Sequence, residues 1–269
     1  MAVAAAIALI VLVIVGLRPR HTAAPNLRRT LVAAYIVRVG RLQVGMATQV
    51  RAIDVLYKRF AHDPATIGKH VAQYRRAQRT LAALRDRLAT VDPPREARAL
   101  QRLLLELAEA NVRAAGAVAG LAAYLPELSK AQAKAGPALA TLRIDVAKAA
   151  TASKQAVAFS AYSATIASVE AQVARLRPPA FFAAAEAAQL AQLRRLTSLA
   201  AEISTALSHK QLKAAQTLVA EIGHVEADIS VLRAQRAGAL SYNAQIKRIR
   251  AISTQIDTER KRLEKRLPA

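Results

Sequence analysis

Residues 84–97 (LRDRLATVDPPREA) and 169–182 (VEAQVARLRPPAFF) each contain a double proline, preceded by apolar residues at the same spacing. The two double prolines, Pro93-Pro94 and Pro178-Pro179, lie 85 positions apart. A residue that precedes proline avoids the α region, so each double proline ends one helix and allows another to begin. The two stretches therefore predict two helical hairpins, each bent at a double proline.

The apolar positions on both sides of the prolines also agree at this offset. The aligned pairs are Tyr74 and Phe159, Leu81 and Ile166, Leu84 and Val169, Leu88 and Val173, Val91 and Leu176, and Val118 and Ile203. Any two helical apolar patterns can be brought into register by chance, but the shared double proline favours a true repeat. We assign the hairpin repeats to residues 64–124 and 138–207. Because neither hairpin can bury its apolar stripe alone, we expect the two to pack together.

Elsewhere in residues 26–269, apolar residues recur at alternating steps of three and four. This spacing is typical of helices with coiled-coil-like packing, and no segment alternates with the period of two that strands require. The sequence therefore predicts an all-α body, an antiparallel bundle of long helices. We expect breaks at Pro126 and at Gly136-Pro137, one continuous helix over 138–176, and a long C-terminal helix over 209–266 that Gly238 breaks or bends.

One of these apolar lines contains a polar residue. The line is Leu100, Leu104, Leu107, Asn111, Ala114, Val118 and Leu121. A buried asparagine in such a seam fixes helix register and partner choice at some cost in stability. We therefore take Asn111 as a candidate for buried polar specificity, with contact to a ligand between helices as the alternative.

The first 17 residues (MAVAAAIALIVLVIVGL) carry no charged side chain. As a helix they would span roughly 25 Å, slightly less than a bilayer's hydrocarbon core. We interpret residues 1–17 as a transmembrane or signal-anchor segment and residues 18–25 as a basic juxtamembrane linker. The membrane-proximal basic residues are Arg18, Arg20, Arg28 and Arg29. A cleaved signal peptide and a buried core helix are the alternatives, although no basic region precedes the apolar run.

The orientation of such an anchor follows from its flanking charges. All nearby basic residues come after the apolar run, so the positive-inside rule places the body on the cytoplasmic side of a single-pass membrane protein. If the native start lies upstream of Met1 and carries basic residues, the body is extracytoplasmic instead.

The net charge is +22, from 40 Lys and Arg against 18 Asp and Glu. No acidic residue precedes Asp54. A C-terminal basic cluster consists of Lys247, Arg248, Arg250, Arg260, Lys261, Arg262, Lys265 and Arg266. This charge favours anionic partners, namely lipid headgroups, acidic polymers, acidic proteins or nucleic acid. Nucleic acid is less favoured, because the chain has no Trp, few other aromatic residues and no zinc-finger or RNA-binding sheet motif.

Motifs for catalysis are weak in this chain. The absence of Cys excludes disulfides, thiolate nucleophiles and Cys-ligated metals, and no phosphate-binding glycine loop is found. Glu221 and His224 have the E-x-x-H spacing of di-iron bundles, but no second E-x-x-H follows, so a solvated helix face explains them better. We expect no catalytic residue, metal or cofactor.

The sequence therefore favours a non-enzymatic, membrane-anchored interaction or scaffold protein with basic surfaces. Two alternatives remain. One is a membrane-tethered protein that binds nucleic acid without sequence specificity, and the other is a sensor-type helical bundle that binds a ligand near Asn111. The long helices make a homo-oligomer possible.

Overall fold

The computed structural model describes residues 27–62 and 64–265, and this part of the chain contains helices and turns but no strand. The elements are α1 (Leu27–His62), η1 (Pro64–His70), α2 (Val71–Ala89), η2 (Arg95–Ala97), α3 (Arg98–Gln132), α4 (Ala135–Lys148), α5 (Ala152–Val173), η3 (Ala180–Phe182), α6 (Ala183–Ser208), α7 (Leu212–Glu226) and α8 (Ser230–Lys265), where η marks a 3₁₀ helix. The predicted all-α fold of packed long helices is confirmed. The predicted membrane segment 1–17 and linker 18–25 lie outside the described residues.

Among the helices that the structure describes, none combines the length and the apolar character needed to cross a bilayer.

The chain divides into two compact units. The first unit contains α1, α2, α3 up to Ala122 and α8 from Leu240 onward. The second unit contains the rest of α3, then α4 to α7, and α8 up to Ala239. Each unit has its own buried apolar core, and each is described separately below.

The core of the first unit is made from apolar residues of its four helices. Leu100 and Leu104 of α3 are completely buried, and so are Tyr74 and Leu81 of α2. Further buried side chains come from α1 and α8: Val32, Tyr35, Val39, Leu42, Met46, Ile53, Tyr242, Ile246, Ile249, Ile252, Ile256 and Leu263. On each of the four helices these buried residues recur at steps of three, four or seven, so they form one apolar stripe. Burial of the four stripes supplies the main driving force for folding.

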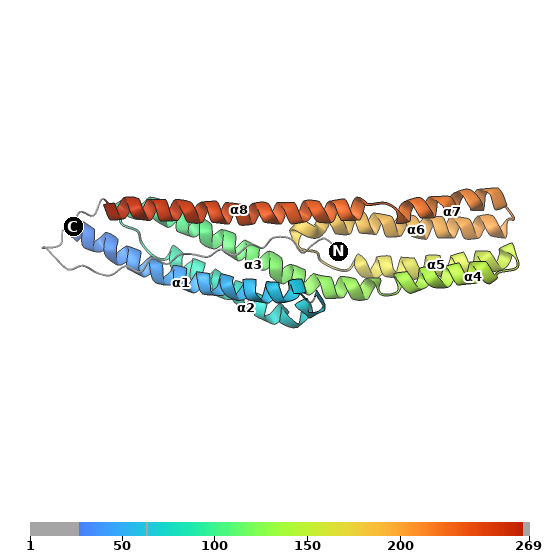
Figure 1. Ribbon diagram of the computed structural model, residues 1–269, viewed down its shortest axis with the longest axis horizontal. Coiled ribbons are helices and arrows are strands. Elements are labelled where there is room, and N and C mark those ends of the chain that lie inside the picture. Colours follow the sequence, from blue (N-terminus) through green and yellow to red (C-terminus); the bar gives the residue numbers. More distant parts are fainter. Residues whose placement is uncertain (1–26, 63, 266–269) are drawn as a thin grey trace. The chain divides into compact units, whose positions relative to one another are not determined.

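The second unit is centred on α5 and α6, which lie side by side (Figure 1). Two serine hydroxyls join these helices directly: Ser163 Oγ donates to the Thr197 carbonyl at 2.9 Å, and Ser204 Oγ donates to the Ala156 carbonyl at 2.8 Å. Such bonds from side chain to backbone need a close approach of the helices, which the alanine-rich faces permit because alanine fills little volume. Helix α4 packs on α5, and α7 packs on α6.

The two double prolines produce the same local structure. After Pro93-Pro94, η2 occupies residues 95–97 and α3 begins at Arg98. After Pro178-Pro179, η3 occupies residues 180–182 and α6 begins at Ala183, so every boundary is displaced by the same 85 positions. In each turn the second proline accepts a backbone hydrogen bond at 2.8 Å, from Ala97 N and from Phe182 N. The predicted bend at each double proline is confirmed.

Pro126 does not end a helix, contrary to the expected break. Helix α3 continues through it to Gln132. A proline inside a helix removes one backbone hydrogen bond and crowds the preceding turn. Here Tyr124 and Leu128 are buried on either side of Pro126, and their burial offsets that cost. Apolar packing has therefore overridden the local preference of the proline.

The helix predicted over 138–176 is interrupted. Helix α4 ends at Lys148, and α5 begins at Ala152. Between them Thr151 has extended backbone angles, and its hydroxyl accepts a hydrogen bond from Lys154 N at 3.3 Å. This is an N-cap, which satisfies a backbone donor that a new helix otherwise leaves unpaired.

The long helix predicted over 209–266 is also divided, and the break is not at Gly238. Helix α7 ends at Glu226 and α8 begins at Ser230. The carboxylate of Asp228 accepts hydrogen bonds from Ser230 N at 2.8 Å and from Ser230 Oγ at 2.9 Å. These two bonds lower the pKa of the Asp228 carboxyl, and they favour a turn over a continued helix.

Gly238 lies inside α8, where it serves a packing role. A Cβ atom at this position would meet the carbonyl oxygen of Phe181 in η3 at 2.1 Å. Only glycine allows this approach, because the contacted atom belongs to the backbone and cannot turn aside. In α7, by contrast, a Cβ atom at Gly223 would meet nothing within 4 Å.

We therefore predict opposite effects for two glycine-to-alanine substitutions in the second unit. Gly238→Ala should destabilise the unit by about 1–2 kcal/mol, because the clash with Phe181 outweighs the gain in helix propensity. Gly223→Ala should stabilise it by about 0.5–1 kcal/mol, because only the gain in propensity operates there. Thermal unfolding followed by circular dichroism measures both. A Gly238→Ala protein as stable as Gly223→Ala would contradict the close approach.

Candidate functional site

The structure places only some of the membrane-proximal basic residues. Arg18 and Arg20 lie outside the described residues. Arg28 lies in the first turn of α1, outside the part of the chain whose side chains are described, and Arg29 is partly exposed. The sequence interpretation of these four residues as a membrane-facing group therefore stays a prediction.

Most of the C-terminal basic cluster lies on exposed faces of α8, although Arg266 falls outside the described residues. Lys247, Lys261 and Lys265 are exposed. Arg250 is exposed as well but has a partner of its own. Arg262 is paired with Glu259 one turn earlier on the same helix. The cluster is therefore a set of helix-surface cations, several of which are already engaged within the chain.

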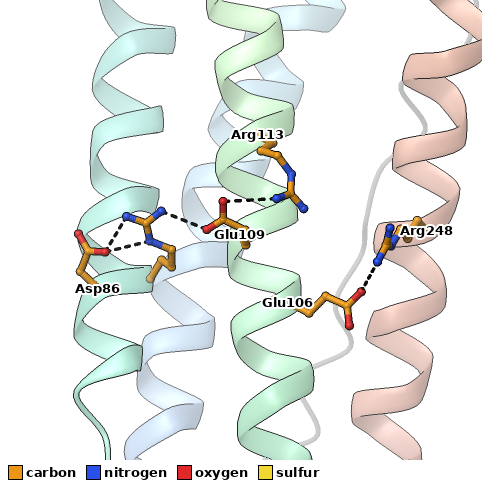
Figure 2. Close-up of polar contacts among 6 residues, drawn as sticks. Asp86, Glu106, Glu109, Arg113 and Arg248 are labelled. Carbon is orange, nitrogen blue, oxygen red and sulfur yellow. Dashed lines mark hydrogen bonds and ion pairs between the residues drawn. The ribbon is translucent and has the colours of Figure 1, made fainter.

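Arg248 joins α8 to α3 across the first unit. Its guanidinium lies 2.7 Å from Glu106 Oε1, and Figure 2 shows Arg248 extending from α8 toward Glu106. On the same unit, Arg85 bridges Asp86 at 2.7 Å and Glu109 at 3.1 Å. Figure 2 also shows Arg113 reaching the other side of Glu109.

These exposed ion pairs contribute little stability, because water and salt screen them. Each pair also occupies a carboxylate and an arginine together, so the net positive charge is carried by the cations that have no acidic partner. The hydrogen bonds that the Arg85 guanidinium donates to Asp86 and Glu109 also raise its pKa.

Arg260 differs from the rest of the cluster because it points into the first unit. Its guanidinium donates to Gln43 Oε1 of α1, and its Nε is buried without a hydrogen-bond partner. Burial lowers the pKa of Arg260, whereas the nearby Asp257 and Glu264 carboxylates oppose that effect. Arg260 was predicted to contribute to an exposed basic surface, but its charge is partly withdrawn from solvent. The periodicity of α8 places it beside the buried Leu263 and Ile256.

A buried polar junction at the first double proline was not predicted from the sequence. Gln101, in the first turn of α3, is 6% exposed. Its Nε2 donates to the carbonyls of Leu88 at 2.8 Å and Val91 at 3.2 Å, while its Oε1 accepts from Tyr35 Oη at 2.6 Å. One amide therefore satisfies carbonyls near the end of α2 and a tyrosine of α1. Burial of that tyrosine raises the pKa of its hydroxyl.

We predict that Gln101→Leu destabilises the first unit strongly, by about 2–4 kcal/mol. The substitution keeps the volume but leaves the Val91 carbonyl and the Tyr35 hydroxyl without the partner that Gln101 supplies. It also removes one of the two hydrogen bonds to the Leu88 carbonyl. Each buried polar group without a partner costs free energy. Chemical denaturation followed by circular dichroism measures the loss. Gln73→Leu on the exposed face of α2 is the matched control and should change stability little.

Glu186 occupies the corresponding position after the second double proline. It is the fourth residue of α6, as Gln101 is of α3, and it is 9% exposed. Its carboxyl lies beside Tyr124 of α3, and its Oε1 is buried without a hydrogen-bond partner. Burial raises the pKa of the Glu186 carboxyl, and the Tyr124 hydroxyl opposes this in part. The second junction thus also places a buried polar residue beside a tyrosine, but that residue is an acid, and no hydrogen bond like the one from Tyr35 to Gln101 joins the two.

The acid makes the stability of the second unit depend on pH. Because the folded pKa of Glu186 lies above the unfolded value, the folded state binds more protons between the two, and stability falls as the pH rises through that window. We predict that Glu186→Gln stabilises the unit at neutral pH by about 1 kcal/mol and has little effect at a pH below the ordinary glutamate pKa. Unfolding curves at both pH values measure this, and equal effects at both would contradict it.

The remaining candidate residues are placed as follows. Asn111 is 8% exposed on α3, within the apolar line that predicted its burial. Glu221 pairs with Arg195 of α6, and His224 is exposed. Among the residues described, no group of His, Asp and Glu is arranged to hold a metal ion.

Two of the open surface grooves are lined by residues that the structure describes. One, of about 320 Å³, lies between α4 and α5 and is lined by Leu142, Tyr162 and several alanines, with Thr141 and Asp145 among its polar residues. The other, of about 530 Å³, lies between α3 and α8 and includes Leu103, Gln255 and Glu259. Asn111 lines neither of these two grooves.

Comparison with known proteins identifies no relative: no family model, no curated protein and no solved structure matches this chain.

Proposed function

We propose that this chain is a non-enzymatic, membrane-anchored scaffold or interaction protein whose basic surfaces contact anionic lipid, acidic polymers or acidic proteins. The observation that supports the proposal is the excess of cationic side chains over carboxylates, many of which are already paired. The ion pairs of the described residues engage Asp54, Asp86, Glu106, Glu109, Glu170, Glu221, Glu226 and Glu259. With 40 Lys and Arg against 18 Asp and Glu, many cations are left to face the solvent.

The proposed anchor is the uncharged segment 1–17, with the body on the cytoplasmic side by the positive-inside rule. Anionic lipid on that leaflet attracts basic residues near the membrane with about 1 kcal/mol for each. Anchor and basic body would then act together, since each keeps the other near the same surface. A true start upstream of Met1 would reverse this orientation.

The scaffold is built, in this proposal, from two copies of one hairpin, residues 64–124 and 138–207, with coiled-coil-like packing. The equal spacing of η2 and η3 and of the helices that follow them supports this view. So do Gln101 and Glu186, two buried polar residues at the same place in the hairpin. Duplication gives a protein repeated surfaces, which suits a scaffold better than a single catalytic site.

Two other functions compete with this one. Nucleic-acid binding would use the same positive charge through counterion release. A sensor bundle would use the apolar groove between α4 and α5 as its ligand site. Neither has a second supporting feature in the described residues, such as an aromatic stacking platform or a convergent set of polar groups.

Vesicle flotation tests the proposal. The full chain should float with vesicles of phosphatidylcholine and, at least about tenfold more strongly, with vesicles that also contain phosphatidylserine, because cations near an anionic surface each add about 1 kcal/mol. The difference should shrink as salt rises. Equal flotation with neutral and anionic vesicles would refute a role for the basic surfaces. Displacement from anionic vesicles by duplex DNA at low concentration would favour the nucleic-acid alternative.

A further inference from the structure

Helix α1 has two contrasting faces. Its inner face is buried in the first unit through Tyr35, Val39, Leu42 and Met46. Its outer face keeps three valines in solvent: Val37 is 49% exposed, Val44 43% and Val55 49%. The three valines lie seven and eleven residues apart, spacings that return to nearly the same side of an α-helix. They form an apolar ridge on the side of α1 opposite the core.

Basic residues flank this ridge. Arg38, Arg41 and Arg51 are exposed on α1, and in the part of the chain that the structure describes none of them has an ion-pair partner. The acidic residue of α1, Asp54, is 5% exposed and pairs with Lys58 at 3.1 Å. The outer face of α1 therefore presents arginines and valines without an exposed carboxylate.

A second copy of this chain fits the ridge poorly. A coiled-coil seam with Val37 and Val44 at one core position and Val55 at the other would also place Arg41 and Arg51 in the seam. Arginines of two identical helices would then be desolvated next to each other without counter-charges. Nucleic acid matches the arginines, but its phosphate backbone offers nothing to the valines.

An anionic bilayer surface fits both kinds of residue. Valines enter the boundary between headgroups and acyl chains, while arginines extend their charged ends back to the phosphates. We propose that the outer face of α1, formed by Val37, Val44, Val55, Arg38, Arg41 and Arg51, lies directly on anionic lipid headgroups. This inference rests on the proposed membrane function and names the surface that carries it.

The absence of Cys from the chain allows a local test. Val44→Cys in the full chain is labelled with a polarity-sensitive fluorophore, and Ser241→Cys, at an exposed position of α8, is the control. With vesicles that contain phosphatidylserine, the emission from position 44 should shift to the blue and that from position 241 should not. Vesicles of phosphatidylcholine alone should give a smaller shift at position 44.

Charge variants then test the arginines. The triple change Arg38→Gln, Arg41→Gln and Arg51→Gln in the labelled Val44→Cys protein should weaken the fluorescence titration by about a hundredfold. The matched control removes the same charge from the exposed face of α2 by Arg75→Gln, Arg76→Gln and Arg79→Gln, and should retain most of the response.

The outcomes separate this inference from the broader proposal. If the chain floats with anionic vesicles but the label at position 44 does not respond, the assignment of α1 is overturned while the membrane function stands. If the α1 and α2 triple variants lose the response equally, positive charge on either helix contributes equally to lipid binding. The assignment of the α1 face is then again overturned. If the chain shows no preference for anionic vesicles, both this inference and the proposed function fail.

Discussion

The double proline is the constraint on which the architecture depends. Two consecutive residues without a backbone N–H cannot continue a helix, so the carbonyls four residues before them, those of Ala89 and Thr90, have no helical donor. In the first unit Gln101 of the next helix donates to the neighbouring carbonyls of Leu88 and Val91 and accepts from the Tyr35 hydroxyl. Three helices thereby meet at one amide. The direction in which α3 leaves the turn is fixed by that amide as much as by the apolar core.

The two junctions show how one backbone arrangement accommodates different chemistry. An amide can donate and accept at once, whereas a carboxylate can only accept. Glu186 therefore leaves one oxygen buried without a partner where Gln101 leaves none of its groups unpaired. Elsewhere in the second unit, serine hydroxyls of α5 and α6 donate to backbone carbonyls of the neighbouring helix.

Apolar periodicity predicted the helices and the burial of Asn111, because both depend on a pattern that recurs along the chain, and the prolines themselves predicted the two turns. Periodicity has less to say about where a helix ends between prolines. It missed the breaks before Ala152 and Ser230, because a single capping side chain, Thr151 or Asp228, decides each of them. Arg260 was assigned to the basic cluster by its charge alone. The spacing of Ile256, Arg260 and Leu263 was the signal that could have placed Arg260 on the buried side of α8, whereas its partner Gln43 depends on tertiary contacts. The outer face of α1 was not predicted, because apolar spacing indicates which side of a helix is buried and does not assign a role to apolar residues on the other side.

Gly238 has a consequence for how α8 is seated in the second unit. There the backbone of one helix approaches the carbonyl of Phe181 so closely that no side chain fits between them. Sliding α8 by one residue in either direction would bring Ala237 or Ala239 to that carbonyl, and the methyl group of either would collide with it. The contact thus permits one register of α8 against η3 and excludes its neighbours. The small and aliphatic residues of α8 resemble one another, so they alone would allow several alignments of α8 with η3. The missing methyl group of Gly238 selects one of these alignments.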